Sequence, residues 1–222
     1  MPGFRVAILP VTVFAQNCTV LFDEETRQAV VFDPGGEPGR ILDLLTRQGL
    51  DLQRILLTHG HLDHAGGATA LQGVLNEQRD AQGKPRIEIW GPDERDRFLL
   101  DAIDQQQAAF GLSGMLNVTP DRWLAEGDTV AFGPLRFDVL HCPGHTPGSV
   151  VYVEQTARLA LVGDVLFRGS VGRTDFPYGD HAALIDAIRT KLLPLGDDIG
   201  FICGHGQGST FGEERRTNRF IQ

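Results

Sequence analysis

Nine short runs rich in β-branched and apolar residues constrain the fold of this chain more than any other feature. They lie at Val6–Val13, Thr19–Phe22, Ala29–Phe32, Arg54–Thr58, Ile87–Trp90, Arg136–Leu140, Val150–Val153, Leu159–Val162 and Gly200–Cys203. Runs of this length between turn-forming residues are typical of β-strands. Apolar residues at helical spacing predict helices over Gly39–Gln48, Ala65–Gln78 and His181–Leu193. The early strands predict an antiparallel meander and the later ones alternate with helices, which favours a layered α/β architecture.

Two polar segments interrupt this pattern, a predicted loop at Gln78–Pro85 and a predicted mobile flap at Gln105–Thr119. Neither is long enough to link two domains, so we expect one domain over residues 1–222. The start, Met1–Ala15, has the charge and apolar run of a signal peptide. It also has a central proline and no Ala-x-Ala type site, so we interpret it as strand.

The composition limits which binding partners and which cellular compartment we expect. The chain has 20 basic and 29 acidic side chains, and the resulting charge of −9 disfavours nucleic acid and anionic membrane surfaces. No stretch approaches the ~18 apolar residues of a membrane span. Three cysteines, Cys18, Cys142 and Cys203, are too few for a disulfide scaffold and suit a reducing compartment. We therefore expect a cytoplasmic protein with a small-molecule substrate. The sequence does not indicate its oligomeric state.

The most specific motif follows directly after the strand expected at Arg54–Thr58. It reads His59-Gly-His61-Leu-Asp63-His64 and holds three histidines and a carboxylate within six residues. Alternating positions on an extended loop allow His59 and His61 to face one metal ion, and Asp63 and His64 to face a second. The alternative is a solvated polar loop, but the chance of the pattern arising at random is on the order of 10⁻³ or below.

Three more candidate ligands occur where later strands end: His145, Asp164 and His205. Each is flanked by the glycine or proline residues that tight turns need, and loops at one end of a sheet can bring distant ligands together. Two histidines are left over. We interpret His141 as a strand-end residue or a partner of a ligand, and His181 as a surface residue at a helix start.

Four ordered motifs carry a family resemblance: T-H-x-H-x-D-H, H-C-P-G-H-T-P-G, G-D-x-L-F-x-G-x-x-G-R and G-H-G. They resemble the metallo-β-lactamase-fold hydrolases, and among these the short glyoxalase-II-like (hydroxyacylglutathione hydrolase) thioesterases. The resemblance runs from the N-terminal strands to Arg216. It implies an αββα sandwich, in which two packed mixed β-sheets carry helices on their outer faces, with a dinuclear metal site at one edge.

The resemblance also implies a ligand set. His59, His61 and His145 would hold one metal ion, Asp63, His64 and His205 the second, and Asp164 would bridge both. The number of ligands supports an open site independently, because a closed structural zinc site needs only four residues. Asp63 and Asp164 are the expected catalytic carboxylates around a metal-bridging hydroxide. The expected metals are two divalent ions, zinc first, with iron or manganese as alternatives. Cys142 is interpreted as a buried structural thiol.

Two further residues have two interpretations each. Asp33, after the strand Ala29–Phe32, resembles the acidic residue that orients the ligand loop in this family, and a turn-forming role is the alternative. Arg173 occupies the place where larger relatives carry a basic residue for glutathione, which predicts binding of a substrate carboxylate. Asp175 stands where those relatives have a tyrosine, so an ion pair between Arg173 and Asp175 is the alternative.

The predicted activity is hydrolysis of a thioester, S-lactoylglutathione or a related S-acylglutathione. The C-terminal helical substrate domain of larger relatives has no counterpart in this sequence, which predicts loose substrate binding. Gly-Arg-Thr-Asp also occurs in mononuclear-iron persulfide dioxygenases of the same superfamily, and these are the main alternative. The Gly204-His205-Gly206 context favours the hydrolase. A lactonase is a further alternative, whereas the bridging position of Asp164 disfavours a β-lactamase and the net charge disfavours a nuclease.

Overall fold

Two units make up the computed structural model, which describes residues 3–222. Unit 1 runs to Gly91 and resumes over Arg97–Trp123, and unit 2 comprises Pro92–Asp96 and Leu124–Gln222. The single domain expected over the whole chain stays a prediction. Met1 and Pro2, the first residues of the segment considered as a signal peptide, lie outside the described residues.

The sheet of unit 1 has the strand order β1-β2-β3-β4-β5. Its strands are β1 (Phe4–Val11), β2 (Gln16–Asp23), β3 (Gln28–Phe32), β4 (Asp51–Leu56) and β5 (Glu88–Trp90). The first three strands pair antiparallel, which confirms the predicted meander, while β4 is parallel to both β3 and β5. Strands β1, β3, β4 and β5 therefore run in the same direction and end at the same edge of the sheet.

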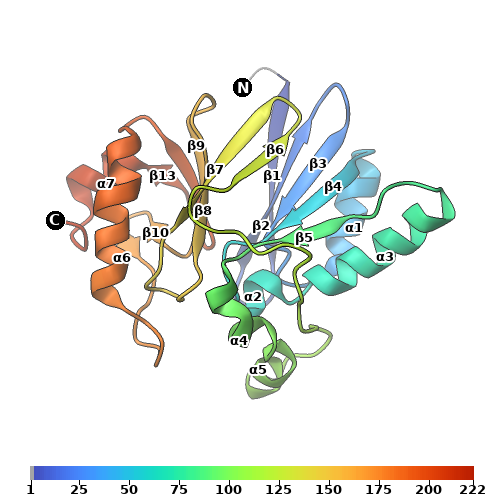
Figure 1. Cartoon of the computed structure of the whole chain (residues 1–222), viewed down its shortest axis with the longest axis horizontal. Helices are drawn as coiled ribbons and strands as arrows, with labels where there is room; N and C mark the ends of the chain where they lie inside the picture. The colour runs from blue at the N-terminus through green and yellow to red at the C-terminus, as the bar shows by residue number, and fades with distance from the viewer. Residues whose placement is uncertain (1–2) are drawn as a thin grey trace. The chain divides into compact units, whose positions relative to one another are not determined.

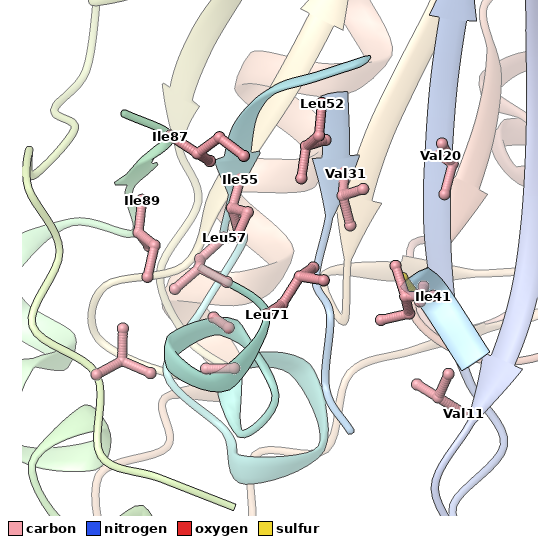
Figure 2. Close-up of a cluster of buried hydrophobic side chains, with 14 of the residues drawn as sticks. Val11, Val20, Val31, Ile41, Leu52, Ile55, Leu57, Leu71, Ile87 and Ile89 are labelled. Atoms are coloured by element: carbon pink, nitrogen blue, oxygen red, sulfur yellow. The ribbon is translucent and has the colours of Figure 1, made fainter. Parts of the chain in front are cut away.

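Helices cover one face of this sheet. The two longest are α1 (Pro38–Arg47) and α3 (Ala68–Ala81), which lie against β1–β5 in Figure 1. Ile41 of α1 and Leu71 of α3 are fully buried in the same core as Val20, Val31 and Ile55 of the sheet (Figure 2). The remaining helices of the unit are α2 (Leu62–Ala65), α4 (Arg97–Leu100) and α5 (Ile103–Ala109). This packing holds the strand ends that carry the predicted metal ligands.

The sheet of unit 2 has the strand order β13-β12-β9-β8-β7-β6. Its strands are β6 (Thr129–Phe132), β7 (Leu135–His141), β8 (Val150–Glu154), β9 (Leu159–Gly163), β12 (Gly200–Cys203) and β13 (Ser209–Thr210). Only β9 and β12 pair parallel within it, and β10 (Leu166–Phe167) and β11 (Ser170–Val171) form a separate hairpin. Both larger sheets are therefore mixed, as expected.

Helical segments cover the unit 2 sheet as well. Helix α6 (His181–Ala187) continues as the π-helical segment η2 (Ile188–Leu192) and the 3₁₀ turn η3 (Leu193–Leu195), and α7 (Phe211–Thr217) follows β13 (Figure 1). The short 3₁₀ turn η1 (Glu94–Asp96) belongs to the same unit. Leu184, Ile188 and Phe211 are fully buried in a core with the strand residues Val151 and Val162.

The structure corrects the bounds of the two predicted irregular segments. The segment Gln78–Pro85 is partly helical, because α3 continues to Ala81, and Arg79 Nε donates a hydrogen bond to the Pro85 carbonyl oxygen at 2.5 Å. The segment Gln105–Thr119 begins as part of α5, and the Gln107 side chain then pins Met115 through two hydrogen bonds of 2.9 Å to its backbone. A side-chain amide that satisfies both backbone groups of Met115 orders the backbone at this residue. Residues 112–119 form no helix or strand, and the mobility of the segment stays a prediction.

Candidate metal centre

The ligand loop of unit 1 connects β4 to α2 and is held by a buried carboxylate. Asp33 lies just beyond the end of β3 and is 3% exposed. Its Oδ1 accepts a hydrogen bond from the Thr58 backbone N–H at 2.7 Å, and its Oδ2 accepts one from Thr58 Oγ1 at 2.6 Å. His64 Nδ1 lies 2.9 Å from the same Oδ2. Asp33 therefore ties the start of the ligand loop to the helix turn that follows it.

These contacts decide which ring nitrogens carry protons. The Thr58 hydroxyl gives its only proton to Asp33, so it acts as an acceptor toward His59 Nδ1 at 3.0 Å. An ionised carboxylate can only accept, so His64 Nδ1 donates to Asp33. Both imidazoles then carry their proton on Nδ1 and a lone pair on Nε2. This is the arrangement in which a histidine binds a metal ion while a second group fixes its orientation.

The ligand atoms of unit 1 stand close enough to share metal ions. His59 Nε2 is 3.1 Å from His61 Nδ1, and Asp63 Oδ2 is 3.9 Å from His64 Nε2. Bonds of about 2.0–2.1 Å to a tetrahedral ion place two ligand nitrogens about 3.3 Å apart. Asp33, His59 and His64 also offer ligand atoms within 4.8 Å of one another. The donors are imidazole and carboxylate, which fit zinc, iron or manganese.

A second set of candidate ligands gathers in unit 2. Asp164 Oδ2, just beyond β9, is 3.5 Å from His145 Nε2 and 3.6 Å from His205 Nε2. His145 follows β7, and its Nδ1 donates a hydrogen bond to the Arg173 backbone carbonyl at 2.8 Å, which again keeps the lone pair on Nε2. One carboxylate oxygen therefore stands nearly equally far from two imidazoles that come from different loops.

The loop that carries His145 is fixed by a second buried carboxylate, Asp96, which is fully buried. Asp96 Oδ2 accepts a hydrogen bond from Thr146 Oγ1 at 2.7 Å, and Asp96 Oδ1 accepts one from the Gly148 N–H at 2.6 Å. Thr146 Oγ1 also lies 2.7 Å from Ser149 Oγ. Sequence reasoning missed Asp96 because nothing in the local pattern links it to residues about fifty positions later.

Glycine is required where the backbone packs directly on two of the candidate ligands. A Cβ at Gly35 would lie 1.4 Å from the Asp63 carbonyl oxygen, and a Cβ at Gly172 would lie 1.9 Å from the Asp164 carbonyl oxygen. No side chain can be accommodated at such distances, so these close approaches need glycine. Backbone contact at both positions helps to hold the two carboxylates in place.

Three other residues singled out in the sequence have defined surroundings. Arg173 forms a bidentate ion pair with Asp175, with Nε–Oδ1 and Nη2–Oδ2 distances of 2.9 and 2.8 Å, and both side chains are largely exposed. This geometry favours the ion-pair alternative, and binding of a substrate carboxylate by Arg173 stays a prediction. Cys142 is fully buried, and burial raises the pKa of its thiol to about 12. Such a thiol stays protonated at neutral pH and is a poor nucleophile.

The two remaining histidines lie at the ends of elements, as expected. His141 is the last residue of β7, and its Nε2 is 2.8 Å from the Pro147 carbonyl oxygen, within the loop that carries His145. His181 is the first residue of α6 and is exposed. Among residues 3–222, no helix is both long and apolar enough to cross a membrane.

Comparison with known proteins gives consistent matches. The model of the metallo-beta-lactamase superfamily matches residues 11–205. The hydroxyacylglutathione hydrolase GloC of Haemophilus influenzae is 45% identical over 98% of both chains. The structure of BLEG-1 B3 metallo-beta-lactamase aligns with a TM-score of 0.82 at 33% identity, covering 98% of this chain and 99% of that one. The di-iron-bound form of TTHA1623 aligns with a TM-score of 0.81 at 36% identity, covering 96% and 99%.

Proposed function

We propose that this chain, which belongs to the metallo-beta-lactamase superfamily and is a hydrolase, cleaves the thioester bond of S-acylglutathiones, with S-lactoylglutathione as the first substrate to test. Support for this substrate class comes from the Haemophilus relative, whose name states hydrolysis of hydroxyacylglutathione. The likeness covers nearly the whole of both chains, so it includes every loop that carries a candidate ligand. The expected fold class and family are confirmed by the same matches.

The metal centre of this proposal uses both ligand sets. We assign His59, His61 and His145 to one divalent ion, Asp63, His64 and His205 to a second, and Asp164 to both. Zinc is the first metal to test, with iron and manganese as alternatives. The observation that carries the proposal is the position of Asp164, whose Oδ2 is 3.5 and 3.6 Å from two imidazole Nε2 atoms. A carboxylate shared between two ions needs such neighbours on both sides.

Divalent ions held by these groups would lower the pKa of bound water from 15.7 to about 7 and polarise the thioester carbonyl. The protein residues position this chemistry. Asp33 and Thr58 orient His64 and His59, and the Arg173 carbonyl orients His145. A thiol nucleophile is disfavoured, because burial raises the pKa of the Cys142 thiol to about 12. Hydrolysis by activated water therefore fits the side chains better than a covalent thiol mechanism.

Metal content and two parallel assays test this proposal. Purified protein should contain two divalent ions per chain, hydrolyse S-lactoylglutathione, and lose that activity when a chelator removes the ions. It should consume no oxygen with glutathione persulfide. One iron per chain with oxygen uptake and no thioester hydrolysis would instead establish the alternative predicted from Gly-Arg-Thr-Asp, a mononuclear-iron persulfide dioxygenase.

A second candidate is hydrolysis of a β-lactam, favoured by the 33% identity to BLEG-1 B3 metallo-beta-lactamase over 98% of this chain. Metal ions in the same centre would polarise a lactam or lactone carbonyl, but the bridging position assigned to Asp164 disfavours the lactam. A chromogenic cephalosporin and a simple acyl lactone belong in the same substrate panel. We expect kcat/KM for S-lactoylglutathione to exceed that for both, and the opposite ranking would reassign the substrate class.

A further inference from the structure

A cavity of about 510 Å³ in unit 1 is not used by the metal ligands. Its wall is formed by the turn after β1, the residues that lead into α1, and the segment after α5. Val13, Leu112 and Met115 supply apolar surface, and Glu37 and Arg40 are its charged residues. Its volume lies within the ~300–1,000 Å³ of small-molecule sites, and its open lining combines apolar and charged side chains.

The cavity borders the ligand loop of the same unit. Strands β1, β3 and β4 end at one edge of the sheet, so the turn after β1 and the ligand loop after β4 share that edge. The contact is also direct. Met115, in the cavity wall, packs on Gly66 at the end of α2, the helix that carries Asp63 and His64. A molecule in the cavity would therefore lie beside the helix that carries Asp63 and His64.

Arg40 and Glu37 are held in place but keep part of their binding capacity. Arg40 Nη1 donates to the Pro10 carbonyl at 3.0 Å and to Glu37 Oε2 at 2.9 Å, and Glu37 Oε2 also accepts from the Thr12 N–H at 2.7 Å. Within the part of the chain that the structure describes, Arg40 Nε and Nη2 and Glu37 Oε1 have no hydrogen-bond partner. Arg40 Nε and Nη2 and one carboxylate oxygen of Glu37 thus remain available to a ligand, and both side chains are partly exposed.

These groups complement an α-amino acid. A guanidinium edge with two N–H donors matches a carboxylate, and a carboxylate oxygen matches an ammonium group. Arg173 is different, because Asp175 already occupies both its Nε and its Nη2. Glutathione carries an α-amino acid at its γ-glutamyl end, where the α-carboxylate and α-ammonium stand on the same carbon.

We propose that this cavity binds the γ-glutamyl end of the thiol half of the substrate, with its carboxylate on Arg40 and its ammonium on Glu37. The inference rests on the proposed function, since it names the site for part of the same substrate. It places recognition of the thiol half in unit 1, whereas the sequence predicted only that Arg173 in unit 2 binds a substrate carboxylate. The apolar wall formed by Val13, Leu112 and Met115 contacts the methylene groups of the γ-glutamyl chain.

Calorimetric binding of S-methylglutathione, which has no thioester to cleave, tests the site without turnover. Loss of a charge-assisted contact by Arg40→Gln should raise Kd about tenfold, and Glu37→Gln should raise it less. Arg47→Gln, on the same helix and largely exposed, is the matched control and should leave Kd unchanged. The S-methyl derivative of γ-glutamylcysteine should show the same dependence on Arg40. That of cysteinylglycine, which lacks the γ-glutamyl end, should show none.

Ser113→Trp provides a variant that fills the cavity and leaves the contacts of Arg40 in place. It should weaken S-methylglutathione binding even if Arg40→Gln is poorly folded. Equal affinity of wild type, Arg40→Gln and Ser113→Trp for S-methylglutathione would overturn the inference. It would also be overturned if Arg40→Gln weakened binding of the S-methyl derivative of cysteinylglycine but not that of γ-glutamylcysteine. Failure of the proposed function is a separate result: wild type would then bind S-methylglutathione in this way without hydrolysing S-lactoylglutathione.

Discussion

Replacement of Asp33 by asparagine should weaken both metal binding and the folded state. The carboxylate accepts three hydrogen bonds, from the Thr58 backbone N–H, from the Thr58 hydroxyl and from His64 Nδ1. Asparagine has the same shape but replaces one acceptor oxygen by an NH₂ donor. Asp33 has a φ of +50°, a conformation that asparagine adopts readily. The substitution therefore changes the hydrogen bonding without adding backbone strain.

The size of the effect follows from these contacts. Whichever way the amide is turned, at least one donor faces another donor, or His64 must move its proton to Nε2. A hydrogen bond to a charged group contributes about 1.5–3 kcal/mol, and burial removes the screening by solvent. Loss of one or two predicts a decrease of about 2–5 kcal/mol in the free energy of unfolding, or roughly 5–15 °C in Tm for a chain of this length. Metal affinity should fall by about 10–100-fold, as for other groups that orient a metal-binding histidine.

Two measurements check this prediction. Thermal unfolding in excess chelator reports the stability of the metal-free chain, and competition with a chromophoric chelator reports zinc affinity. Asp23→Asn is the matched control, because the Asp23 carboxylate accepts two backbone hydrogen bonds in a turn without touching a candidate ligand. Zinc affinity should be unchanged in this control. Wild-type zinc affinity in Asp33→Asn would refute the view that the carboxylate sets the proton position of His64.

Three further predictions concern single side chains. Asp164→Ala should abolish most thioester hydrolysis and reduce the bound metal measured by elemental analysis, whereas full activity at unchanged metal content would exclude a bridging role. Arg173→Ala should leave kcat/KM nearly unchanged, because Asp175 already takes both Nε and Nη2, and should leave Tm unchanged, because an exposed ion pair contributes little; a loss of about tenfold in kcat/KM confined to carboxylate-bearing thioesters would instead support binding of a substrate carboxylate by Arg173. Desolvation opposes ionisation of Glu126, but the hydrogen bonds from Lys191 and from the His141 backbone N–H, together with the charges of these two residues, outweigh it and lower the pKa of the Glu126 carboxyl below its ordinary 4.5. Glu126→Gln should thus cost less than about 1 kcal/mol at pH 7, and chemical unfolding should show this difference vanish as the pH falls through the lowered pKa.

The regular parts of the fold could be predicted because their apolar residues follow a local period. The strand expected at Gly200–Cys203 is β12, and the helix expected at Gly39–Gln48 is α1, displaced by one residue at each end. The elements that the sequence analysis did not predict are short, such as β6 and α7. Strand β6 has only four residues and becomes a strand by pairing with β7. Helix α7 had a local signal, since Thr210 and Glu213 form the start of a capping box, and Thr210 Oγ1 accepts from the Glu213 N–H at 3.1 Å.

The candidate metal ligands could be found from the sequence because imidazole and carboxylate groups at such spacing have few other uses. A sequence motif shows which residues can bind a metal ion, but it does not show which nitrogen of each imidazole ring carries the lone pair. In this protein that choice depends on acceptors contributed by other segments: Asp33 for His64, 31 residues away, and the Arg173 carbonyl for His145, 28 residues away. His59 depends on Thr58, its neighbour, but Thr58 is itself oriented by Asp33. The sequence therefore predicts the composition of the site, while its proton arrangement follows only from the folded chain.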